Sequence, residues 1–203
     1  MRQRTYEKTE RERERTGEQE NRRESNGNAY GGSVMGNARS KEEARGDAER
    51  REDMLAAFTD MAQGKFLDKV AHVTSKDIKN LPVDKYVLVD VREDALRKVS
   101  HIPGSITQGD FERKRKEDKG AFAGKTVITS CTIGYMSGLF AAKLSKDPTF
   151  SGDLKNHKGS IMDWCYEGFD LVDDKGETTK NVHGVATKWA KLFPQDKGYN
   201  IVL

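Results

Sequence analysis

The sequence predicts one α/β domain with a mainly parallel sheet, preceded by a charged tail. The segment Tyr86–Val89 is a continuous apolar run, which is typical of a strand buried on both faces, and Lys125–Thr129 is a second strand of this kind. Helical patterns alternate with the strands along the chain, as they do in parallel sheets. A change of composition near residue 53 separates a polar tail from a segment that can form a core.

The first 53 residues are too polar to fold on their own. They hold 13 basic, 13 acidic and only 9 apolar residues, so they bury too little surface to offset the entropy lost on ordering. Residues 1–24 mix opposite charges, and residues 25–40 are rich in Gly, Asn and Ser. We expect residues 1–53 to be a disordered tail, either solvated or used as an arm that binds a partner.

The elements that follow are predicted from caps, breakers and periodicity. Asp53 can cap a helix and Gly64 can end it, so residues 54–69 form a short helix and a linker. Ser75 caps the next helix and Pro82 breaks the chain after it. The predicted order is helix Met54–Gln63, strand His72–Thr74, helix Lys76–Asn80, strand Tyr86–Val89, helix Glu93–Val99, strand Ser105–Ile106, helix Gly109–Glu117, strand Lys125–Thr129, helix Gly134–Ser145, strand Leu154–His157 and helix Ile161–Glu167. Residues 174–203 form an extension that we expect to pack on the domain.

Composition excludes several classes of protein. No apolar run approaches the roughly 18 residues of a membrane helix, and no signal peptide follows Met1, so we expect a cytoplasmic protein, with an organelle as the alternative. The net charge of +3 is too small to indicate nucleic-acid binding, and acidic residues flank the basic run Arg113–Lys116. Two cysteines and four scattered histidines show no metal-ligand spacing. Cys165, beside Trp164, is predicted to be a core thiol rather than a resolving cysteine.

Cys131 stands between a buried strand and a helix. In open α/β sheets this edge is where ligands bind. The N–H groups of a strand-to-helix loop can form an anion cradle, and the helix N-terminus adds partial positive charge. Both effects favour the thiolate form of a cysteine, and Gly134 permits a backbone conformation that other residues resist. Cys131 is therefore a candidate nucleophile, although a lone cysteine at a strand end is more often an inert core residue.

Four motifs occur around this loop in a recognisable order. They are Asp90–Val91–Arg92–Glu93, His101–Ile102–Pro103–Gly104–Ser105–Ile106, the loop Cys131–Ser137, and the segment Asn156–Trp164. The series resembles the rhodanese-like family, which reads D-x-R-x, H-I-P-G-A, C-x-x-G-x-x-S and N-L-x-G-G-x-x-x-W. The resemblance covers residues 70–173. It implies a five-stranded, mostly parallel sheet with helices on both faces and a sulfurtransferase site after the central strand.

The resemblance also implies roles for the site residues. Cys131 would carry sulfane sulfur as a persulfide from thiosulfate or a persulfide donor to a thiol or cyanide acceptor. Loop N–H groups would bind that sulfur, through residues Thr132, Ile133, Gly134, Tyr135, Met136 and Ser137. Asp90, Arg92 and His101 would support the site. No cofactor or metal is implied. The partners are a small sulfur donor and a thiol acceptor, which could belong to a protein.

The sequence departs from the family pattern in the loop itself. Thr132 and Met136 stand where the family often has arginine, which weakens the expected binding of dianionic thiosulfate. Ser105 and Ser160 replace an alanine and a glycine. A non-catalytic rhodanese-like module that binds a partner is the alternative. Phosphatase or arsenate reductase chemistry is disfavoured, because phosphate binding needs a longer loop that ends in arginine.

Overall fold

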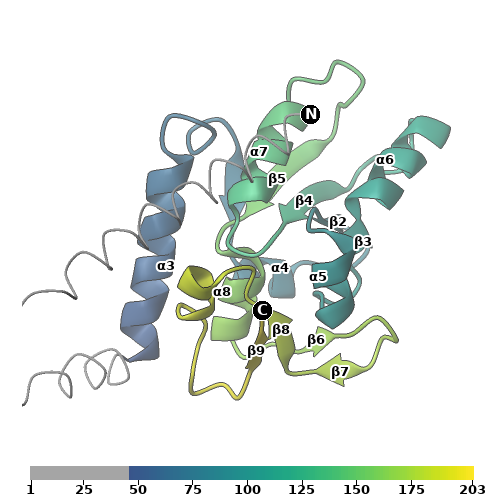
Figure 1. Cartoon of the computed structure of the whole chain (residues 1–203). Coiled ribbons are helices and arrows are strands. Elements are labelled where there is room, and N and C mark those ends of the chain that lie inside the picture. The colour runs from purple at the N-terminus through teal and green to yellow at the C-terminus, as the bar shows by residue number, and fades with distance from the viewer. Residues whose placement is uncertain (1–45) are drawn as a thin grey trace, which may run out of the picture. The chain divides into compact units, whose positions relative to one another are not determined.

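The computed structural model describes residues 46–203, so residues 1–45 of the tail predicted over 1–53 lie outside the described part of the chain. These residues form a five-stranded sheet of order β1-β5-β4-β2-β3, in which every neighbouring pair runs parallel (Figure 1). The strands are β1 (Ala71–Val73), β2 (Tyr86–Asp90), β3 (Ile106–Thr107), β4 (Thr126–Ser130) and β5 (Asp153–His157). The predicted α/β class and mostly parallel sheet are confirmed.

Five helices alternate with the strands, each within one residue of its predicted bounds. They are α4 (Ser75–Asn80), α5 (Asp94–Val99), α6 (Gln108–Glu117), α7 (Tyr135–Leu144) and α8 (Ser160–Tyr166). The cap of α4 is Thr74, not Ser75 as predicted, and it forms a capping box with Asp77. Ser75 is instead buried at the start of the helix, where its side chain is free for the tertiary contacts described below.

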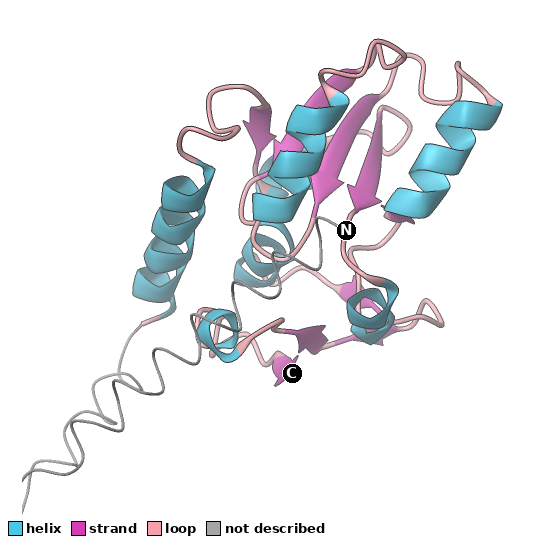
Figure 2. Ribbon diagram, turned by 45° about the horizontal axis from the view of Figure 1, so that its top comes forward, coloured by secondary structure: helices cyan, strands magenta, loops and turns pink. Residues whose placement is uncertain are grey.

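Two apolar clusters lie against the sheet. Leu88 and Ile128 belong to the larger cluster, whereas their strand neighbours Val89 and Val127 belong to the smaller one. Successive residues of a strand point to opposite faces, so the clusters mark the two faces of the sheet. Phe111 of α6 completes the smaller cluster. Figure 2 shows the central strands flanked by helices, so both faces are covered.

The helix before the sheet, α3 (Asp47–Ala62), begins seven residues earlier than predicted. Residues 47–53, which the sequence analysis assigned to the disordered tail, are therefore helical. Charged contacts explain the difference. Arg50 bonds Asp47 at 2.6 Å, and Arg51 reaches Asp163 of α8 at 2.6 Å and Glu167, just after α8, at 2.5 Å. The Arg50–Asp47 pair is local, but the partners of Arg51 lie more than a hundred residues away, where no local pattern could indicate them.

The chain after α8 carries elements that were not predicted, and all but the first lie in the extension 174–203. They are β6 (Leu171–Val172), β7 (Thr178–Thr179), β8 (Asn181–His183), α9 (Thr187–Ala190) and β9 (Asn200–Val202), with β6 antiparallel to β7 and β8 parallel to β9. The extension contacts the rest of the domain: the Tyr166 hydroxyl of α8 donates to the carbonyl of Leu192 in the extension at 2.5 Å. The Gln195 N–H also donates to Asp47 in α3 at 2.9 Å. Within residues 46–203, no helix is long and apolar enough to cross a membrane.

Candidate functional site

Cys131 directly follows β4, the middle strand of the sheet. The loop from Cys131 to Gly134 then leads into α7. Gly134 has a φ of 94°, in the left-handed region, and a Cβ built there would lie 2.8 Å from the His157 carbonyl oxygen. Any larger residue would push the loop away from the end of β5, so Gly134 fixes how closely the cysteine loop approaches the sheet.

The Cys131 thiol is nearly buried and faces two hydrogen-bond donors. The residue is 5% exposed. The Gly134 N–H donates to Sγ at 3.2 Å, and the Ser137 hydroxyl lies 3.5 Å from Sγ. Donors of this kind stabilise negative charge on sulfur. Both belong to the N-terminal end of α7, where the helix dipole adds to the effect.

Asn156 of β5 holds Ser137 in place. Its Nδ2 donates to the Gly134 carbonyl at 2.9 Å, which turns its Oδ1 toward the Ser137 hydroxyl at 2.7 Å. One hydroxyl proton cannot serve both Oδ1 and Sγ. The Ser137 hydroxyl can therefore donate to Asn156 while Cys131 is a thiol and rotate toward Sγ when Cys131 is a thiolate. Asn156 begins the fourth family motif, but the sequence alone did not predict a role for it.

Asp90 and Arg92 form a buried, two-pronged ion pair. Arg92 Nη2 and Nε donate to the Asp90 carboxylate at 2.8 and 3.0 Å, and Nη2 also donates to the Ser100 carbonyl at 2.8 Å. Arg97, which was not singled out in the sequence, reaches the same carboxylate at 3.3 Å and the Ser105 carbonyl at 2.6 Å. These contacts fix the end of β2 against α5 and the segment that follows it, as expected of a pair that supports the site.

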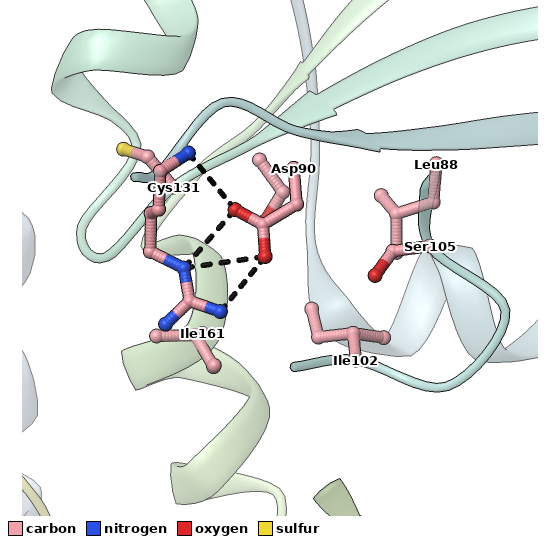
Figure 3. A pocket seen from close by; sticks show the side chains of 8 residues that line it. Leu88, Asp90, Ile102, Ser105, Cys131 and Ile161 are labelled. Atoms are coloured by element: carbon pink, nitrogen blue, oxygen red, sulfur yellow. Dashed lines mark hydrogen bonds and ion pairs between the residues drawn. The ribbon is translucent and has the colours of Figure 1, made fainter. Parts of the chain in front are cut away.

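A small pocket, too tight to hold a water molecule, lies next to the cysteine loop. It is lined by Leu88, Asp90, Arg92, Ile102, Ser105, Ser130, Cys131 and Ile161. Cys131 is one of these lining residues, and in Figure 3 its sulfur points away from Asp90 and Ser105. The Asp90–Arg92 ion pair lines the same pocket.

His101 forms hydrogen bonds with main-chain groups. Its Nδ1 lies 3.3 Å from the Arg97 carbonyl oxygen, and its backbone exchanges hydrogen bonds with Val172 at 2.8 and 3.0 Å. Burial lowers the pKa of the His101 imidazole, so the ring is held neutral. These contacts join α5 to the C-terminal segment and support the scaffolding role expected for this residue.

The other predicted loop residues differ in exposure. Thr132, Ile133 and Tyr135 are buried, whereas Met136 is 46% exposed. The Lys65 ammonium lies 2.9 Å from the Tyr135 hydroxyl and 4.9 Å from the centre of its ring. Lys65 belongs to the segment predicted as a linker, and nothing in its sequence context placed this cation beside the loop.

Comparison with known proteins identifies the domain. A family model described as the rhodanese-like domain matches residues 74–167. The chain therefore carries a rhodanese-like domain, as its four motifs predicted. A comparison with curated protein sequences gave no match.

Several solved structures are similar to this chain. A rhodanese-related protein from Thermoplasma volcanium is 22% identical, with 50% of this chain and 97% of that chain covered and a TM-score of 0.42. The thiosulfate sulfurtransferase from Pseudomonas aeruginosa is 16% identical, with 68% and 26% covered and a TM-score of 0.45. The polysulfide-sulfur transferase homodimer from Wolinella succinogenes is 21% identical, with 60% and 91% covered and a TM-score of 0.42.

Proposed function

We propose that this protein is a sulfurtransferase in which Cys131 carries the transferred sulfur. The observation that carries the proposal is the thiol itself, which faces the Gly134 N–H at 3.2 Å at the start of α7, inside a rhodanese-like domain. A thiolate in this place is a nucleophile, and its persulfide would meet the same donors. The proposed donor is thiosulfate or a persulfide, and the proposed acceptor is a thiol or cyanide.

The reaction balances as two displacements. The Cys131 thiolate attacks the outer sulfur of the donor, an Sγ–S bond forms, and the donor's S–S bond breaks. The leaving group, sulfite or a thiolate, departs with the bonding electron pair. An acceptor thiolate or cyanide then attacks the outer sulfur of the Cys131 persulfide, and Cys131 leaves as a thiolate ready for the next donor. Neither step needs an added oxidant or reductant.

Backbone N–H groups of the loop would stabilise the negative charge on the outer sulfur of the persulfide. Gly134 supplies the donor closest to Sγ, and the Ser137 hydroxyl supplies a second. Asp90, Arg92 and His101 are proposed as supporting residues, because their side chains contact one another or main-chain carbonyls of the scaffold. Because Cys131 is 5% exposed, we expect the donor to reach Sγ through a narrow opening beside the exposed Met136 side chain.

A single-turnover experiment tests the proposal. The protein is mixed with thiosulfate or with a small persulfide, and its intact mass is measured before and after addition of a thiol or cyanide. We expect a gain of one sulfur atom that the acceptor removes. Cys131→Ser should show no gain. If the wild-type chain shows none with either donor, the proposal fails and the alternative, a non-catalytic binding module, gains support.

Cys165→Ala is the matched control for this experiment. Cys165 is fully buried in α8, and burial raises the pKa of its thiol, so it stays protonated and inaccessible at neutral pH. We expect Cys165→Ala to keep the sulfur adduct. Loss of the adduct in this variant would show that the transfer needs a second cysteine.

A further inference from the structure

Ser160 adopts a backbone conformation that normally favours glycine. Its φ is 47°, in the left-handed region, and it is one of two non-glycine residues with positive φ in the described part of the chain. The preceding Gly159 has a φ of 74°, so two left-handed residues in succession begin α8. A serine in this conformation costs free energy that a glycine would not. We therefore expect its side chain to make a contact that offsets this cost.

The Ser160 side chain binds the backbone of the candidate nucleophile. Its hydroxyl oxygen accepts a hydrogen bond from the Cys131 N–H at 2.9 Å and donates to the His157 carbonyl at 2.9 Å. The next residue, Ile161, donates its N–H to the Cys131 carbonyl at 3.3 Å. Cys131 is thus held on both of its main-chain groups by two consecutive residues of α8.

This contact has no substitute when the hydroxyl is missing. Ser160 is fully buried and Cys131 is 5% exposed, so water has little access to the Cys131 N–H. With glycine or alanine at position 160, this N–H would be buried without a partner, which is unfavourable. Rotation of the Cys131 peptide would relieve the penalty, but it would also turn Sγ away from the Gly134 N–H.

We propose that Ser160 is a positioning residue for Cys131, whose hydroxyl sets the orientation in which the Gly134 N–H faces Sγ. The backbone strain at Ser160 is the cost of this contact. The inference rests on the proposed function only for its effect on sulfur transfer, because the orientation of the thiol can be measured without any sulfur donor.

The test separates strain from positioning with two substitutions. Ser160→Gly removes both the hydroxyl and the strain, whereas Ser160→Ala removes the hydroxyl alone. Ser75→Ala is the matched control, because it removes another buried hydroxyl, 2.8 Å from His157 Nε2, and leaves the Cys131 N–H bonded. All variants are made in the Cys165→Ala background, so that Cys131 is the only cysteine.

The readouts are the rate of iodoacetamide alkylation as a function of pH and the thermal midpoint. We expect Ser160→Gly to react about twofold to tenfold more slowly than its parent at pH 7, with its alkylation profile displaced to higher pH. It should melt above Ser160→Ala, because glycine relieves the backbone strain that alanine keeps. Ser160→Ala should show the same displacement with a lower midpoint, and Ser75→Ala should keep the parental profile. Coincident profiles for Ser160→Gly and the parent would overturn the proposal, as would an equal displacement in Ser75→Ala.

This design distinguishes the two proposals. If the wild-type chain forms no sulfur adduct but Ser160→Gly displaces the alkylation profile, the proposed function fails and the positioning role stands. If the adduct forms and the profiles coincide, the function stands and the positioning role is wrong.

Discussion

At the scale of the residue, the exposed side chain of Met136 bears on the choice of donor. Met136 occupies a position where the family often has arginine, and it is 46% exposed, so a longer side chain has room there. We expect Met136→Arg to lower the KM for thiosulfate by about tenfold to a hundredfold, because a charge-assisted contact contributes about 1.5–3 kcal/mol. The KM for a less charged persulfide should change little. Steady-state kinetics with both donors measure the effect.

Met136→Gln is the control for this change, because it replaces methionine with a neutral polar side chain of similar length. An unchanged thiosulfate KM in Met136→Arg would contradict the expectation and would mean that another cation already serves the site. Arg92 and Arg115 are held by acidic partners at 2.8 and 2.7 Å. Lys65, beside Tyr135, would then be the residue to substitute.

The candidate nucleophile could be predicted from the sequence, but not all of its surroundings. The position of Cys131 could be predicted, because a buried strand followed by a glycine-containing helix start is a local pattern. The ion pair of Asp90 and Arg92 is local as well. The contacts of Ser160 and Lys65 with the loop join residues far apart in the sequence, and single serine and lysine residues carry no signal of their own.

At the scale of the element, α7 packs closely against the segment that follows α3. A Cβ built on Gly138 would lie 2.1 Å from the ring of Phe66, which is fully buried against Tyr135 and Phe58 and cannot move aside. We expect Gly138→Ala to destabilise the protein by about 1–3 kcal/mol through overpacking, although alanine favours a helix. Urea denaturation gives the free energy of unfolding.

Gly109→Ala, in α6, is the matched control for Gly138→Ala. A Cβ on Gly109 in α6 would meet only Thr107 Oγ1, at 3.8 Å, which is an ordinary contact. Gly109→Ala should therefore leave stability unchanged or raise it by up to about 1 kcal/mol. A Gly138→Ala protein as stable as Gly109→Ala would show that α7 and Phe66 are not in close contact.

The elements that could be predicted are those with a local signature. Tyr86–Asp90 and Thr126–Ser130 lie in the middle of the sheet, so their burial shows as apolar runs. The start of α3 and the two small sheets after residue 170 have no such signature. Their strands have two or three residues each, and α3 depends on distant charged partners for its first turns. Their placement is decided by tertiary contacts.

At the scale of the whole molecule, one buried polar network joins several elements around the site. His157 at the end of β5 contacts the Ser75 hydroxyl at 2.8 Å through Nε2 and the Ser130 hydroxyl at 3.2 Å through Nδ1. Asp163 of α8 accepts the Ser75 N–H at 3.0 Å and binds Arg51 of α3 at 2.6 Å. The network therefore connects α3, α4, α8 and the two strands that flank the cysteine loop, and its strength should depend on the charge of His157.

The burial of His157 determines the direction in which stability changes with pH. His157 is fully buried, and desolvation lowers the pKa of its imidazole to about 4, against about 6.5 in an unfolded chain. Between these values the unfolded chain binds a proton that the folded protein does not, so stability is complete above pH 6.5 and falls as the pH falls toward 4. We expect the contribution of His157 to the free energy of unfolding to decrease by about 2 kcal/mol from pH 7 to pH 5. Urea denaturation of the wild-type chain and His157→Gln at both pH values measures it, because glutamine does not titrate and the other histidines are common to the two proteins. Parallel pH dependence in the two proteins would show that His157 titrates normally and that the network is open to water.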